Sequence, residues 1–417
     1  MLFLSRAKAP KRHRPTRVGI AIAGGGPLGG IYELGALRAL EEAIGGLDLT
    51  QLSVYVGVSS GALIAAALAS GLDTAEQCRI FITGDSTVAR FRPDTFVRPA
   101  VLEYLRRAAS VPGMLLRWLG DVARHPFAPH LSDTLLTFGS VLPTGIFDNA
   151  GIERFLHEIL TSGGRQDDFR TLARPLYVIA AELDSGRAVR FGDAQHSHVP
   201  ISRAVAASAA LPGLYPPVRI GSKFYVDGAL QRTLHASAVL DAGADLVLGI
   251  NPLVPFDSAG ARAKGRDTPE SLIRNGLPAV LSQTFRTLLQ SRLRSSVAKY
   301  AREYAHADLM LFEPDADDAE MFFTNVFSFA GRERMAEHAY RATRAELRMR
   351  AAELAPVLAR HGLQLRQDVL ADDGRSLRGG LRRRGTHAAA RLHQALDALD
   401  ENLPRRRPAA AKKRARR

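Results

Sequence analysis

Residues 57–61 read GVSSG, and Ser59 is the serine that satisfies the GxSxG spacing with Gly57 and Gly61. Between a strand and a helix, this pattern forms a sharp turn that exposes the serine hydroxyl as a nucleophile. Glycine suits both flanking positions because a Cβ atom would clash in so tight a turn. An ordinary turn with a capping serine fits the same letters, with Ser60 as well as with Ser59. The five residues therefore leave an acyl-transfer nucleophile and a plain turn both open.

A nucleophilic serine also needs hydrogen-bond donors for the oxyanion that forms on its substrate. The stretch AGGGPLGG at 23–30 follows an apolar strand and opens a helix, so its backbone N–H groups can serve as these donors. The glycines proposed for this oxyanion hole are Gly24, Gly25, Gly26 and Gly29. A dinucleotide fingerprint, GxGxxG, fits the same loop, but it requires an acid about 20 residues later, at the end of the second strand. That strand ends in GVSSG instead, and Asp48 precedes it, which disfavours nucleotide binding.

The base that would activate the serine is harder to find. The chain has 12 histidines, so a Ser-His-Asp triad is not excluded by their number. His196 and His198 lie in a loop and His235 opens a helix, and all three are predicted to be surface residues. Asp227, in FYVDGAL, stands at a strand end and is better placed. An aspartate is a weak base at neutral pH, but burial beside a hydroxyl would raise its basicity, whereas a plain Asp-Gly turn would leave it inert.

Apolar strand segments alternate with helical patterns along the chain, which predicts an α/β fold with a mainly parallel central sheet flanked by helices. The predicted strands are 18–24, 53–58, 175–183, 188–192, 245–252 and 308–314. The predicted helices include 60–70, 201–211, 270–306 and 330–358. VRIGSKFYVDGAL predicts a hairpin with Gly221 at its turn. The run from Val54 to Leu72 is broken by glycine and serine, so it predicts a buried strand and helix rather than a membrane span.

Four stretches, in this order, resemble the patatin-like phospholipases. They are GGGPLG (24–29), GVSSG (57–61), ASAALPGLYPPV (207–218) and DGA (227–229), and PTGIFDNAGIERFL (143–156) is typical of bacterial members. The resemblance covers roughly 18–250. One motif would be weak, whereas the set in this order and spacing is specific.

The resemblance implies a three-layer α/β architecture and a serine lipid acyl hydrolase with a Ser–Asp dyad. A hydrolase of this kind needs no metal or cofactor. By that resemblance Ser59 is the nucleophile, Asp227 is the base, and Gly228 and Ala229 complete the DGA motif. The implied reaction is phospholipase A-like or lysophospholipase-like hydrolysis through an acyl-enzyme. Family members usually carry Arg or Lys before the last glycine of the loop, where this chain has Leu28, so we expect slower turnover or a less charged substrate.

The domain organisation follows from pattern and composition. We predict a basic N-terminal arm at 1–17, a catalytic domain at 18–250, a helical extension packed on the core at 251–363, and a basic, disordered tail at 364–417. Residues 84–145 mix helical spacing with Arg, Pro and aromatics and predict an inserted helical cap. Its Trp118 is predicted to pack on the core, with a lipid-facing position as the alternative.

The net charge of +14 belongs to the two ends of the chain. Residues 1–17 carry +6 and residues 374–417 carry +11, which leaves −3 for the part between them. Basic arms attract anionic membranes, granule surfaces or nucleic acid. An alternative function is therefore surface binding with little or no catalysis, or an esterase acting at storage-polymer granules, and nucleic-acid binding by the tail is a further alternative.

The compartment is predicted from cysteine usage and from the first residues. Cys78 is the single cysteine, which excludes an internal disulfide and fits a reducing compartment. MLFLS is too short for the apolar part of an export signal. We therefore expect a cytoplasmic protein with peripheral membrane contact. The sequence sets neither the oligomeric state nor the preferred headgroup, acyl position or ester class.

Overall fold

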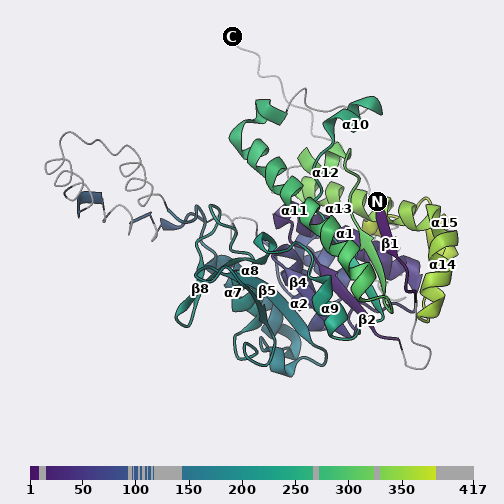
Figure 1. The fold of residues 1–417 in the computed structure, drawn as a ribbon, viewed down its shortest axis with the longest axis horizontal. Coiled ribbons are helices and arrows are strands. Elements are labelled where there is room, and N and C mark those ends of the chain that lie inside the picture. The colour runs from purple at the N-terminus through teal and green to yellow at the C-terminus, as the bar shows by residue number, and fades with distance from the viewer. Residues whose placement is uncertain are drawn as a thin grey trace, which may run out of the picture.

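The fold is described from a computed structural model of the chain (Figure 1). The described residues are 1–8, 16–92, 143–265, 272–323 and 329–381, with scattered residues between 96 and 116. Most of the predicted cap, including Trp118, lies outside them, and so does the tail from 382 onward.

The described part of the chain forms a nine-stranded sheet in the order β1-β10-β9-β2-β4-β5-β8-β7, with β6 also paired to β5. Its parallel strands are β2 (Val18–Ile22), β4 (Val54–Val58), β5 (Leu176–Glu182), β9 (Leu246–Ile250) and β10 (Asp308–Phe312). Its antiparallel strands are β1 (Leu2–Ser5), β6 (Ala188–Phe191), β7 (Val218–Ile220) and β8 (Lys223–Asp227). The central strands are continuous apolar runs because both of their faces are buried.

Helices cover both faces and make three layers. One face packs with α1 (Gly26–Ala43), α2 (Ser60–Ala69), α8 (Ile201–Ser208) and α13 (Phe329–Met349), and the other with α9 (Ala236–Asp241) and α11 (Gly276–Glu303). The remaining helices are α3 (Thr74–Cys78), α7 (Ala150–Thr161), α10 (Ser258–Ala263), α12 (Ala319–Phe323), α14 (Ala351–Arg360), α15 (Gln367–Ala371) and α16 (Leu377–Leu381), and short helical turns lie at Arg79–Thr83, Ser162–Gly164, Phe169–Thr171, Gly228–Leu230 and Leu272–Asn275.

The predicted fold class is confirmed. The run from Val54 to Leu72 is β4 followed by α2, and the hairpin of β7 and β8 turns at Gly221 with a φ of 61°. Cys78 is buried as a free thiol. Within the described ranges, no helix is both long and apolar enough to cross a bilayer.

Two domain boundaries differ from the prediction. Residues 2–5 are not part of a free basic arm, because the apolar segment LFLS forms the sheet edge beside β10. The extension after residue 250 contains the strand predicted at 308–314, and this strand, β10, lies between β1 and β9 in the central sheet.

The predicted tail also begins too early. Residues 364–381 are folded: β11 (Gln364–Leu365) pairs with β3 (Ile44–Gly45), and α15 and α16 follow it. Leu377 and Leu381 are buried in the main core, and Arg375 forms an ion pair with Glu42 of α1. These apolar side chains are few and widely spaced among arginines, which is why composition alone pointed to disorder.

Candidate active site

Ser59 occupies a strained turn between β4 and α2. Its φ of 53° and ψ of −121° make it the one non-glycine residue with a positive φ among the described residues. Such a conformation is costly for an L-residue and is concentrated at functional sites. A Cβ atom on Gly57 would lie 2.4 Å from Ala62 Cα, and one on Gly61 would lie 2.4 Å from the Ala23 carbonyl oxygen. Both flanking glycines are therefore required by packing, as the GxSxG pattern predicts.

Ser208, at the end of α8, holds this turn from the neighbouring helix. The Ser59 N–H donates to Ser208 Oγ at 2.8 Å, and the Ser208 hydroxyl donates to the Ile179 carbonyl at 2.5 Å. The Asp227 N–H donates to the Ala210 carbonyl at 3.0 Å, two residues further along. The stretch 207–218 therefore anchors both Ser59 and Asp227. The sequence pattern marks this stretch as a motif, but the role of Ser208 leaves no signal in it.

Asp227 ends β8, which pairs with β5 next to β4. Its carboxylate is buried and accepts a hydrogen bond from the Ala229 N–H at 2.8 Å, and the Ser59 hydroxyl lies close enough to it to lower its pKa. Burial raises the pKa of Asp227 to about 6, and the Ala229 N–H and the Ser59 hydroxyl oppose this rise. The structure thus brings Ser59 and Asp227 together, although 168 residues separate them in the chain. A Cβ atom on Gly228 would lie 2.2 Å from the Ile179 carbonyl oxygen, so glycine is required there as well.

The glycine loop lies against Ser59. A Cβ atom on Gly24 would lie 2.9 Å from Ser59 Cβ and 3.4 Å from Ala229 Cβ. Gly26 begins α1 with a φ of 62°, a value that favours glycine. Gly25 and Gly29 lie under Pro252, whose ring would clash with a Cβ atom at either position.

The loop's N–H groups are not equally available. The Gly25 N–H donates to Ser60 Oγ at 3.0 Å, and the Gly29 N–H donates to the Gly25 carbonyl at 3.0 Å. The N–H groups of Gly24 and Gly26 make no hydrogen bond to the described residues. Of the four predicted donors, Gly24 and Gly26 are therefore the two that can receive a substrate oxygen in this conformation.

Ser60 does more than start α2, because its hydroxyl is the acceptor that holds the glycine loop at Gly25. The neighbouring Glu33 of α1 is fully buried, and burial raises its pKa well above the usual range while the Ser60 hydroxyl opposes this rise. Both carboxyl oxygens of Glu33 lack a hydrogen-bond partner among the described residues, which favours the neutral acid. The Ser60 hydroxyl thus holds the loop, and Glu33 lies near it as a neutral acid.

Replacing Ser60 by alanine is expected to lower kcat by about tenfold with little change in KM, because the loop loses its anchor and the donors lose alignment. Steady-state kinetics on a soluble ester measures this. Ser70→Ala is the matched control, since Ser70 follows the same helix and its buried hydroxyl has no hydrogen-bond partner among the described residues. Equal rates for Ser60→Ala and Ser70→Ala would contradict the anchoring role.

The predicted surface position is wrong for one histidine. His235 is buried at the start of α9, and burial lowers its pKa to about 3, so it stays neutral. Its Nε2 has no hydrogen-bond partner among the described residues. His196 is partly exposed and pairs with Asp193, and His198 is exposed, as predicted. The hydrogen bonds of the described residues join none of the three to Ser59 or Asp227.

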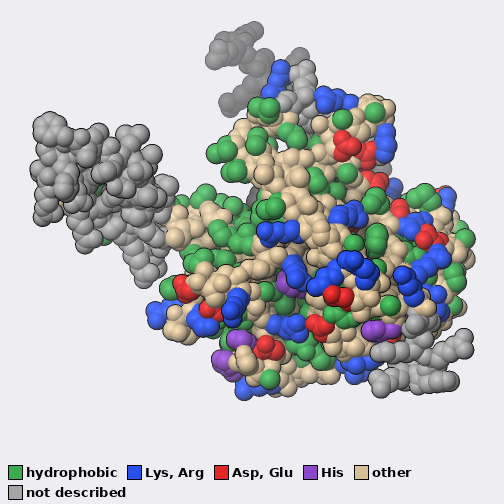
Figure 2. Space-filling model, viewed as in Figure 1, with side chains coloured by type: hydrophobic (Ala, Val, Ile, Leu, Met, Phe, Trp, Pro, Cys, Tyr) green, Lys and Arg blue, Asp and Glu red, His purple; other side chains and the backbone are tan. Residues whose placement is uncertain are grey.

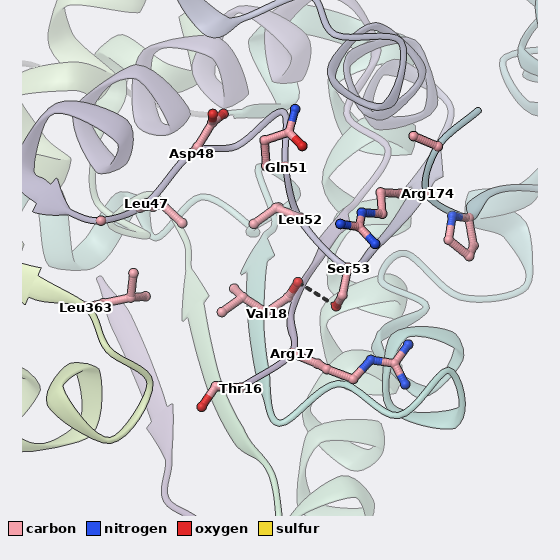
Figure 3. Close-up of a pocket in the computed structure, with 13 residues that line it drawn as sticks. Thr16, Arg17, Val18, Leu47, Asp48, Gln51, Leu52, Ser53, Arg174 and Leu363 are labelled. Atoms are coloured by element: carbon pink, nitrogen blue, oxygen red, sulfur yellow. Dashed lines mark hydrogen bonds between the residues drawn. The ribbon is translucent and has the colours of Figure 1, made fainter. Parts of the chain in front are cut away.

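A hollow of about 450 Å³ lies at the other end of the sheet (Figure 3). Val18, Ser53 and Pro175 line it at the amino ends of β2, β4 and β5, and Figure 3 shows Ser53 bonded to the Val18 carbonyl. Ser59 follows the carboxyl end of β4, where ligands of parallel α/β sheets bind. The hollow is therefore not part of the candidate active site.

A three-layer α/β fold with a strained GxSxG serine beside a buried aspartate defines a patatin-like architecture. Residues 20–240 match the family model for the patatin-like phospholipase. The chain belongs to the patatin-like phospholipase family, which is a family of lipid hydrolases.

Two curated relatives are uncharacterized NTE family proteins of Mycobacterium bovis and Mycobacterium tuberculosis. Each is 26% identical over 225 residues, which cover 53% of this chain and 28% of the relative. The chain thus matches less than a third of the length of these relatives. Similar solved structures include VipD from Legionella pneumophila (18% identity, TM-score 0.30, 60% of this chain and 52% of that one) and human GIVD cytosolic phospholipase A2 (13%, 0.30, 81% and 60%). These structural likenesses are too low to support any inference about activity.

Proposed function

We propose that this protein hydrolyses lipid acyl esters through an acyl-enzyme on Ser59. The observation that carries the proposal is the position of Ser59, at a strained turn, beside the buried Asp227 carboxylate. A carboxylate with a pKa of about 6 is ionised at neutral pH and is a better base than an ordinary aspartate.

The reaction proceeds in two halves. Asp227 takes the Ser59 proton as Oγ attacks the ester carbonyl, and the N–H groups of Gly24 and Gly26 receive the oxyanion. Asp227 then gives the proton to the leaving alcohol as the C–O bond breaks. In the second half, Asp227 takes a proton from water, the hydroxide oxygen attacks the acyl carbonyl, and Ser59 recovers its proton as the fatty acid leaves.

A lipid panel tests this function. The purified chain is incubated with phospholipids, lysophospholipids, triacylglycerols and a polyester, and released fatty acid or hydroxy acid is measured beside Ser59→Ala. Acyl release by the wild type from a lipid ester, and none by the variant, supports the proposal. Hydrolysis of the polyester alone would favour the granule esterase instead.

Leu28 is half-buried against the core at the place where the family usually has a cation. We expect Leu28→Arg to raise kcat on an anionic phospholipid by about three- to tenfold, since a cation beside the oxyanion loop would stabilise developing negative charge. Leu28→Gln, similar in length but neutral, is the control, and thermal melting checks that both variants fold. An unchanged rate for Leu28→Arg on every ester would count against this effect.

A second candidate function is surface binding with little or no catalysis, which the charge of +11 at 374–417 favours. It predicts that deleting 382–417 removes vesicle binding from a chain that has no esterase activity. We also propose a cytoplasmic location with peripheral membrane contact, which fractionation of cells expressing the full chain would test.

A further inference from the structure

Helix α11 presents an exposed apolar face. Leu277, Val280, Leu281 and Leu288 have exposed fractions of 68%, 40%, 58% and 50%. Their spacing of three, four and eleven residues from Leu277 places them on one side of the helix, with the exposed Thr284 between them. We call these four apolar residues the α11 outer face. So many large apolar side chains on one exposed stripe mark an interaction surface rather than scattered surface residues.

The α11 outer face is distinct from the face by which the helix packs on the sheet. Leu289, Leu293, Val297 and Tyr300 are buried and lie along the second half of α11. Three of these join the core cluster under β9 and β10. Figure 1 shows the first half of α11 extending past the sheet, and Figure 2 shows hydrophobic side chains gathered on this projecting region. The fold is therefore held by one side of α11, and the outer face is left to solvent.

Helix α11 is also hydrogen-bonded to two segments that adjoin the candidate active site. Arg292 donates to the Leu230 carbonyl at 3.1 Å, three residues after Asp227. Arg286 donates to the Val254 carbonyl at 3.2 Å, in the segment whose Pro252 covers the glycine loop. These two bonds tie α11 to the segments that follow Asp227 and Pro252.

The charge on the helix identifies the chemistry of the partner. Within α11 the basic residues outnumber the single acid, Glu303; they are Arg286, Arg292, Arg294, Lys299 and Arg302. Arg292, Lys299 and Arg302 are exposed. Exposed leucines beside exposed basic residues suit an anionic bilayer, because binding gains from buried apolar area and from attraction to anionic lipids.

We propose that the α11 outer face docks the protein on an anionic lipid bilayer, with its leucines entering the headgroup region and the exposed basic residues contacting lipid phosphates. The proposal rests on the proposed function, because a lipid hydrolase must reach esters that stay in a bilayer. Docking through α11 brings the Asp227 and glycine loops to the membrane surface.

The test uses the full chain and a triple variant, Leu277→Gln, Leu281→Gln and Leu288→Gln, whose substitutions are all on exposed side chains. Binding is measured by sedimentation with vesicles of phosphatidylglycerol and of phosphatidylcholine. It is repeated at about 1 M salt, where a Debye length of about 3 Å screens attraction by the basic tail. We expect the triple variant to bind phosphatidylglycerol vesicles at least about tenfold more weakly, because each lost leucine removes buried apolar surface.

Met349→Gln is the control, since Met349 is an exposed apolar residue at the end of α13 and is not part of the α11 outer face. It should bind as the wild type does, and both variants should hydrolyse a soluble short-chain ester at the wild-type rate. Ser59→Ala should keep vesicle binding and lose hydrolysis. If the wild type binds vesicles through the leucines but has no esterase activity, docking is supported and the proposed function is wrong. Docking would be overturned if the triple variant bound vesicles as strongly as the wild type. If the unmutated protein were a dimer and the triple variant a monomer with unchanged vesicle binding, the face would be a dimer interface instead.

Discussion

Ser59→Ala is expected to lower ester hydrolysis by roughly four orders of magnitude, because it removes the atom that attacks the carbonyl. A fluorophosphonate probe should label the wild type at one site and leave the variant unlabelled, which separates loss of the nucleophile from loss of substrate binding. The fold should persist, since the backbone bonds of the turn, including the one from the Ser59 N–H to Ser208, do not need the Ser59 hydroxyl.

His196→Ala is the control for a histidine-based triad and should keep wild-type labelling, because His196 pairs with Asp193 near the surface. Retained labelling of Ser59→Ala, or its loss in His196→Ala, would show that the nucleophile or the base lies elsewhere.

Asp227→Asn should lower kcat by about three orders of magnitude or more, because the amide cannot take the Ser59 proton. In the wild type, the base must be ionised, and burial raises its pKa to about 6. The rate should therefore fall as the pH falls through about 6, by about tenfold per pH unit below it. Rates on a soluble ester between pH 4 and 9 measure this, and a wild-type profile in Asp227→Asn would contradict the assignment.

The same group links catalysis to stability. Its pKa in the folded state lies above the ordinary value of 3.8, so the stability that it contributes is present below that value and is lost as the pH rises through about 6. At pH 8 the folded protein carries a buried charge, which costs on the order of 2–3 kcal/mol. Asp227→Asn should therefore unfold at a higher temperature than the wild type at pH 8, and the difference should shrink at pH 5. Equal melting temperatures at both values would show that Asp227 is not destabilised by its burial.

The class of fold and the main site residues could be predicted from the sequence because they leave local signals. Continuous apolar runs such as VGIAI and VYVGV predict buried parallel strands, and the structure has them as β2 and β4. Glycine patterns mark turns that no other residue fits, and the clashes at Gly57, Gly61 and Gly228 confirm them. Asp227 stands out as an acid at a strand end beside a glycine.

Other features depend on contacts between distant segments, and only the tertiary structure decided them. The Ser208 hydroxyl reaches the Ser59 N–H across 149 residues, and Ser60 reaches Gly25 across 35. The pairing of β1 with β10 also joins segments that lie far apart in the chain. A hydroxyl or a short apolar segment carries no mark of its distant partner in the local pattern. Local spacing thus determined which residues could do the chemistry, and packing of remote elements decided which N–H groups are free, which carboxylate is buried, and which face of α11 is left exposed.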